Sequence, residues 1–164
     1  MKQVHYTLFF FTLPIATILS FTFFTVAIAE VIPDNTLGAE SSIITPNVVI
    51  KGILSEEIGG GAVRGANLFH SFQDFNINTA RGAYFSNPPG IANILSRITG
   101  SNPSKILGTL GVLGNANLFF INPNGIIFGQ NTRLDVGGSF LASTANSLVT
   151  RHPNHCHIQS WSTL

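Results

Sequence analysis

The stretch NANLFFINPNGIIFG, residues 115–129, places a turn signal between two apolar runs. Asn122 can cap a tight turn with its side chain, Pro123 presets φ at the second position, and Asn124 tolerates the third. Gly125 takes the positive φ that closes a type I turn with a bulge. The stretch therefore predicts a rigid β-turn between two buried strands. Turn chemistry alone requires no role for this turn beyond specifying the fold.

Other short β-type runs lie on both sides of this turn and are separated by Asn, Gly and Pro. They cover residues 48–50, 67–69, 72–77, 83–85, 106–107, 118–121, 126–128 and 140–142. Turn signals that recur this often indicate an all-β protein. One segment is ambiguous, because the apolar spacing within residues 91–99 suits either a helix or a strand.

Two all-β layouts fit such runs, a sandwich and a solenoid. A sandwich needs longer strands with one hidden face, whereas a solenoid needs very short strands joined by tight corners. The 16 glycines and a charged fraction of only 9% favour the solenoid. Stacked coils would carry Asn ladders and inward apolar columns, and roughly 20–25 residues per coil would give about five coils. The open first coil needs a cap, for which residues 31–61 are the candidate.

The N-terminal residues 1–29 have the pattern of a secretory signal. Lys2 precedes an apolar stretch, and Ala27 and Ala29 form a small-residue cleavage site directly before Glu30. We expect cleavage after Ala29. The alternative is an uncleaved membrane anchor, since residues 8–29 are long enough to span a bilayer.

Composition excludes several classes of function. A net charge of +1 with scattered basic residues argues against nucleic-acid binding, and a single Cys excludes a disulfide framework or a Cys-based zinc module. Asp74 and Asp135 are far apart in sequence, Glu56-Glu57 suits a loop cap, and His70 lies in an apolar run. We therefore predict no enzyme activity, no catalytic residue, no metal site and no cofactor.

The sequence changes character after Val149, where the Gly/Asn pattern stops. Residues 150–164 concentrate His and the only Cys, but their spacing matches no standard zinc site. We expect residues 150–164 to be a divergent, poorly ordered tail, appended by a frameshift or premature stop. The last coil would then expose an unpaired edge and promote aggregation.

Three segments resemble a known family, the filamentous haemagglutinin N-terminal domain, which is the secretion domain of two-partner-secretion exoproteins. They are GANLFHSF with DFNI at residues 65–77, residues 115–129, and RLDVGGSFLAST at residues 133–144. The resemblance covers about residues 31–148 and defines a domain at 30–149. The chain departs from the family where an earlier Asn-Pro-Asn-Leu motif is common, because it has Asn87-Pro88-Pro89-Gly90 there.

This resemblance implies a right-handed parallel β-helix with an N-terminal cap. It implies export by the Sec machinery and recognition by the periplasmic docking domains of an outer-membrane β-barrel transporter. The secretion motif would comprise Asn122, Pro123, Asn124, Gly125 and Ile126. The product would be secreted or held at the cell surface, with any host or cell-surface receptor bound by a missing downstream region. The alternative is a secreted β-solenoid that binds or cleaves carbohydrate.

Overall fold

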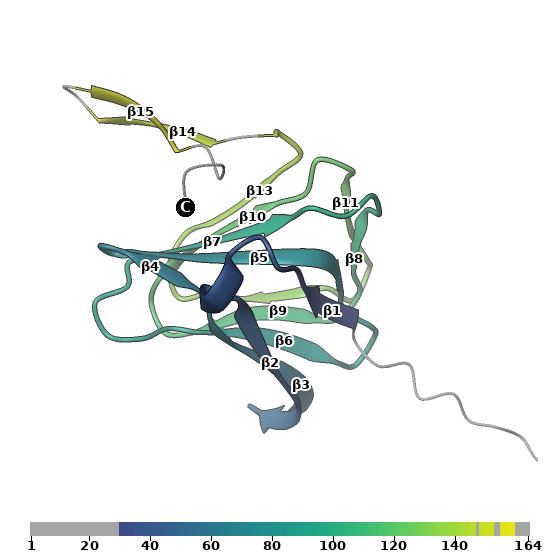
Figure 1. The fold of residues 1–164 in the computed structure, drawn as a ribbon. Coiled ribbons are helices and arrows are strands. Elements are labelled where there is room, and N and C mark those ends of the chain that lie inside the picture. The colour runs from purple at the N-terminus through teal and green to yellow at the C-terminus, as the bar shows by residue number, and fades with distance from the viewer. Residues whose placement is uncertain (1–29, 147, 153–154, 160–164) are drawn as a thin grey trace, which may run out of the picture.

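The computed structural model describes residues 30–146, 148–152 and 155–159, and these residues form an all-β solenoid (Figure 1). The first sheet contains β1 (Glu30–Pro33), β4 (Ala62–Arg64), β5 (Asn67–Asn76), β7 (Asn93–Ile98), β10 (Asn117–Ile121) and β13 (Phe140–Ser143). The second contains β2 (Ser42–Ile50), β3 (Ile53–Gly60), β6 (Gly82–Ser86), β9 (Thr109–Leu113) and β12 (Arg133–Asp135). The third pairs β8 (Ser104–Ile106) with β11 (Ile126–Phe128).

Strands from successive coils stack in parallel register to give about four turns. Equivalent positions Asn67 and Asn93 are 26 residues apart, and Asn93 and Asn117 are 24 apart. The predicted five coils are therefore wrong. The chain makes fewer turns because residues 30–50 form the cap and the early coils are longer than expected.

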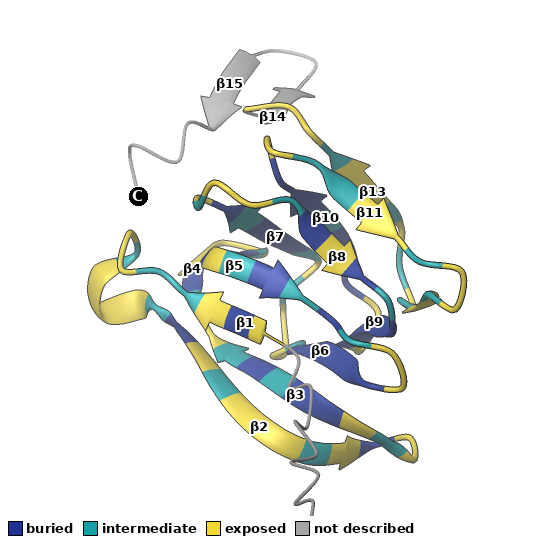
Figure 2. Ribbon diagram, turned by 90° about the vertical axis from the view of Figure 1, so that its right-hand side faces the viewer, coloured by how far each residue is buried: buried dark blue, intermediate teal, exposed yellow. Residues whose placement is uncertain are grey.

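Apolar side chains fill the space between the sheets, as the solenoid prediction requires. Leu68, Ile94 and Leu118 form one inward column across three coils. The rings of Phe72, Phe75, Phe85 and Phe120 pack against one another in the same core. Burial is concentrated in the middle coils, and exposed residues gather on β2 at one end and on β11 and β13 at the other (Figure 2).

The ambiguous segment at 91–99 contains a strand, β7, so the helical alternative is wrong. Ile94 and Ile98 face the core, and Leu95 packs on the outside against Phe69 and Ala62. The helix-like spacing arises because both faces of this strand are covered: the interior by the core and the outer face by the cap.

Antiparallel strands close the N-terminal end of the solenoid. β4 and β1 pair with successive parts of β5, and β2 pairs with β3. A short 3-10 turn, η1 (Gly38–Glu40), joins β1 to β2. The cap predicted at 31–61 is therefore present, although β3 also pairs in parallel with β6 and so belongs to the first coil. The pairing covers strand edges that would otherwise be free to bind another chain.

Beyond β13 the chain forms an antiparallel pair, β14 (Leu148–His152) and β15 (His155–Gln159). This pair includes part of the tail expected at 150–164, and the origin of that tail stays a prediction. The leader expected at residues 1–29 lies outside the described residues. Within the part of the chain that the structure describes, no helix is long and apolar enough to cross a membrane. The same residues contain no group of three or more His, Cys, Asp or Glu placed to hold a metal ion.

Candidate functional site

The Asn-Pro-Asn-Gly segment forms a corner of the third coil. The Gly125 amide donates to the Asn122 carbonyl at 3.1 Å, and Gly125 has φ +118°, which favours glycine. The predicted tight turn is thus confirmed. It links β10 to β11, which belong to different sheets. The expectation of two buried flanking strands is wrong for β11, where Ile127 is 50% exposed.

Asn122 is fully buried and ties this corner to the preceding coil. Its Nδ2 donates to the Asn102 carbonyl at 3.0 Å and to Ser104 Oγ at 2.9 Å. Its Oδ1 accepts from the backbone amide of Asn124 at 2.9 Å. The side chain therefore satisfies a set of polar groups inside the fold and presents nothing to solvent.

Pro123 and Asn124 form the exposed tip of the corner. Asn124 Nδ2 donates to the Gly100 carbonyl at 2.6 Å, which adds a second link to the coil below. An open groove of about 470 Å³ runs beside the tip and is lined by Arg97, Thr99, Ser101, Pro123, Asn124 and Asn146. A partner that touches this corner would meet Pro123 and Asn124 and would not reach Asn122. Ile126, the last residue of the predicted motif, is partly buried against the core.

A ladder of Asn side chains runs along a different corner. Asn93 Nδ2 donates to Asn67 Oδ1, and Asn117 Nδ2 donates to Asn93 Oδ1, both at 2.9 Å. The ladder ends where Asn117 Oδ1 accepts from the Ser139 amide at 2.8 Å. The ladder expected from the sequence is thus confirmed, and its period has a signal in the sequence. The tetrapeptides ANLF at 66–69, ANIL at 92–95 and ANLF at 116–119 mark the same position in three coils.

Three of the remaining polar candidates, Asp74, Asp135 and Glu57, have structural partners. Asp74 accepts from Asn102 Nδ2 at 2.9 Å, and Asp135 pairs with Lys51 Nζ at 2.6 Å. Glu57 accepts from Ser86 Oγ at 2.9 Å. Glu56 and Glu57 lie within β3, so the expected loop cap is wrong.

His70 is buried, and its Nδ1 lies 2.9 Å from Ser42 Oγ.

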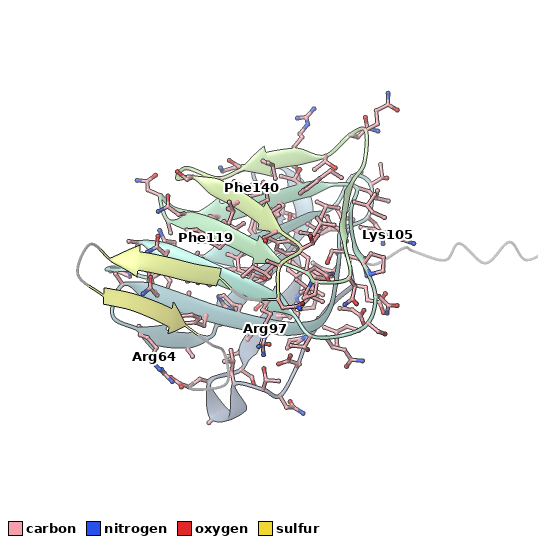
Figure 3. The ribbon with its side chains drawn as sticks, turned by 90° about the horizontal axis from the view of Figure 1, so that it is seen from above. Arg64, Arg97, Lys105, Phe119 and Phe140 are labelled. Carbon is pink, nitrogen blue, oxygen red and sulfur yellow. The ribbon has the colours of Figure 1, made fainter. Side chains whose placement is uncertain are left out.

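Among the basic residues, Arg64 and Lys105 lie on opposite sides of the molecule, and Arg97 lies apart from both (Figure 3). Of the predicted cleavage residues, Ala27 and Ala29 lie outside the described residues, and Glu30 begins β1 opposite Asn76.

Comparison with known proteins connects this fold to a family. The profile of the TPS secretion domain, where TPS denotes two-partner secretion, matches residues 29–160 and so spans the cap, the coils and both β14 and β15. The chain belongs to the TPS secretion domain family. The heme/hemopexin-binding protein of Haemophilus influenzae is 28% identical to this TPS domain over 83 residues, which are 51% of this chain and 9% of that protein.

Membership of the family gives the function at the level of the domain. It is the secretion domain of a two-partner-secretion exoprotein, and the carbohydrate-binding or carbohydrate-cleaving alternative is not favoured. The second partner in this system is an outer-membrane transporter, so the family implies a partner of that class. The role of the domain is secretion, while the absence of catalysis stays a prediction.

Proposed function

We propose that this TPS domain is carried to the periplasm by the Sec machinery, is recognised by the periplasmic docking domains of an outer-membrane β-barrel transporter, and leaves the cell through that barrel. The supporting observation is the family match over a capped solenoid that keeps the Asn-Pro-Asn-Gly corner. A chain that threads a pore should be free of cross-links, and residues 30–150 contain no Cys. The exported product reaches the cell surface or the medium, where a region downstream of this domain binds the receptor.

The five motif residues divide into two roles in this proposal. Asn122 and Gly125 build the corner, since one is buried and hydrogen-bonded and the other has a positive φ. Ile126 anchors the start of β11 on the core. Pro123 and Asn124 supply the contact for the transporter, because they are the exposed part of the motif and border the groove.

Export of the full chain from cells that also produce a two-partner-secretion outer-membrane transporter tests this division. Pro123→Ala keeps the buried Asn122 contacts. It should lower the amount of chain in the medium while lowering the melting temperature of the purified protein no more than Pro89→Ala does. Pro89→Ala, at an exposed corner between β6 and β7, is the matched control and should export normally. Equal export of both variants would remove the recognition role from Pro123.

The leader is tested separately on the exported product. Signal cleavage after Ala29 predicts that mass spectrometry finds Glu30 at the N-terminus, where β1 begins. A product that retains residues 1–29 and stays with the inner membrane would support the uncleaved anchor instead.

A further inference from the structure

Buried polar atoms without hydrogen-bond partners gather in the first two coils of the solenoid. Among the described residues these atoms include Glu56 Oε2, His70 Nε2, Arg81 Nε and Ser96 Oγ. The described part of the last two coils contributes no such atom. Buried polar groups normally have hydrogen-bond partners, so the unpaired polar atoms distinguish this part of the core from the last two coils.

The Glu56 position is apolar in each later coil, and the His70 position is apolar in the last two coils. Glu56 stacks beside Ala83, and the same column continues as Leu110 and Leu134. His70 stacks beside Ser96, and its column continues as Phe120 and Ala142. Since Ala83, Leu110 and Phe120 belong to the main core, both ionisable side chains face the interior of the first coil.

The cap strand β2 closes over both groups. Ser42, near its start, contacts His70 Nδ1 at 2.9 Å, which is a side-chain link between cap and interior. The pairing of β2 with β3 shifts between Thr45 and Val48, opposite Glu56. Asn47 in this bulge has φ +61° and accepts from both terminal nitrogens of Arg81 at 3.3 Å. The cap strand is thus irregular at the position where it covers the buried carboxyl group.

The surroundings favour the neutral form of each group. Burial lowers the pKa of His70 to about 4, and its neighbours are Ser42 from β2, Phe72 from its own strand and Phe85 from β6. Burial raises the pKa of Glu56 to about 7, opposed by the charge of Arg81. His70 therefore weakens the folded first coil as the pH falls below the unfolded value of 6.5. Glu56 weakens it as the pH rises above the unfolded value of 4.5.

We propose that β2 and the first coil form a latch that opens before the rest of the solenoid, because they bury His70 and Glu56, which weaken the first coil at low pH and at high pH respectively. The two groups act in opposite directions over the same pH range, so their effects offset in the intact protein. Use of the latch in export rests on the proposed function. The latch itself does not, and its test needs no transporter.

Hydrogen exchange of the full chain, corrected for intrinsic rates, tests the latch at about pH 4.5 and about pH 7.5. In the wild type, β2 amides should exchange faster than β10 amides at both values. Glu56→Gln removes one of the two titrating groups and keeps His70. The protection factors of β2 amides should therefore fall roughly tenfold or more when the pH is lowered from about 7.5 to about 4.5. His70→Phe leaves Glu56 alone, so β2 protection should fall by a similar factor as the pH is raised.

Glu57→Gln is the matched control, because its side chain comes from the neighbouring position of β3 and binds Ser86. It should keep the shallow pH dependence of the wild type. If His70→Phe does not fold, Glu56→Gln decides alone. Protection of β2 equal to that of β10 in the wild type, or no pH slope in Glu56→Gln, would overturn the proposal.

Discussion

Single side chains hold neighbouring coils of this solenoid together at its corners. Asn122 reaches the Asn102 carbonyl and Ser104 Oγ, while Asn124 reaches the Gly100 carbonyl from a more exposed position. These hydrogen bonds differ in burial. When a buried partner is removed, the polar groups that it contacted stay buried and cannot bond to water instead. The two asparagines of the motif should therefore differ in their contribution to stability.

We expect Asn122→Ala to lower the free energy of unfolding by about 1–3 kcal/mol, because it leaves Ser104 Oγ buried without this donor. Asn124→Ala should lower it by about 0.5–1.5 kcal/mol, since its bond lies at the surface. Urea unfolding of the two variants measures both values. An equal loss of unfolding free energy in both variants would show that the burial of Asn122 does not set its contribution to stability.

Gly111 on β9 makes room for the ring of Tyr84 on β6. A Cβ at Gly111 would contact the Tyr84 ring, and Tyr84 is itself 1% exposed. Burial and a hydrogen bond to Asp135 raise the pKa of Tyr84 to about 12, so the hydroxyl stays protonated and donates.

We therefore expect Gly111→Ala to destabilise the protein by about 1–3 kcal/mol through overpacking. Gly59→Ala on β3 is the control, because a Cβ there meets nothing within 4 Å. Thermal unfolding compares the two, and equal melting temperatures would contradict the packing argument.

Among the elements, the cap is fastened by one carboxylate that follows β1. Asp34 accepts from the Thr36 amide at 2.9 Å, from Thr36 Oγ1 and Ser71 Oγ at 2.7 Å, and from Thr99 Oγ1. Burial acts to raise the pKa of Asp34, but bonds from Thr99, Thr36 and Ser71 outweigh it and hold this pKa below its ordinary value. Asp34 thus joins the cap to the first two coils in its charged form.

A carboxyl group with a lowered folded pKa adds stability above its unfolded pKa of 3.8, and that stability is lost as the pH falls through the folded value. Asp34→Ala should lower the free energy of unfolding by about 1–3 kcal/mol at neutral pH. The difference from the wild type should shrink below about pH 4. Asp74→Ala, which removes a single bond from Asn102, is the control and should have a smaller effect. Urea unfolding across this pH range gives the comparison.

The whole molecule has two unlike ends. Antiparallel strands cover the first coil, whereas β11, β12 and β13 at the opposite end present Ile127, Phe128, Leu134 and Leu141 at 42–50% exposure. Strands β11, β12 and β13 pair on one side only within the described sheets. Exposed strand edges with apolar side chains favour association between chains.

We expect the purified chain to associate as its concentration rises, through the end formed by β11, β12 and β13. Leu134→Lys combined with Leu141→Lys should reduce association, because charges on an edge oppose strand pairing. Ile43→Lys at the capped end, where Ile43 is 63% exposed, is the control. Light scattering over a concentration series measures the difference, and equal association of both variants would place the contact elsewhere.

Much of the architecture follows from local sequence. Asn and Gly set the corners, short β-branched and aromatic runs set the strands, and Gly125 requires its positive φ whatever surrounds it. The number of coils is harder to predict, because the cap takes residues 30–50 and only the short ANLF and ANIL repeats carry the period. The helix-or-strand choice at Ile94 and Leu95 could not be made locally, since only the tertiary structure packs the outward Leu95 against Ala62 and Phe69.

The sequence by itself determined the all-β class and the tight turn at Asn122–Gly125, because turn chemistry and short apolar runs act over a few residues. The resemblance to a secretion domain also needs only the sequence, since it rests on the segments at 65–77, 115–129 and 133–144. Only the tertiary structure decided that Asn122 is buried and Pro123 exposed, and that Glu56 and His70 share the interior of the first coil. Those facts depend on which residues of different coils stack on one another. That register is set by coil length and by the cap, which join residues far apart in the chain.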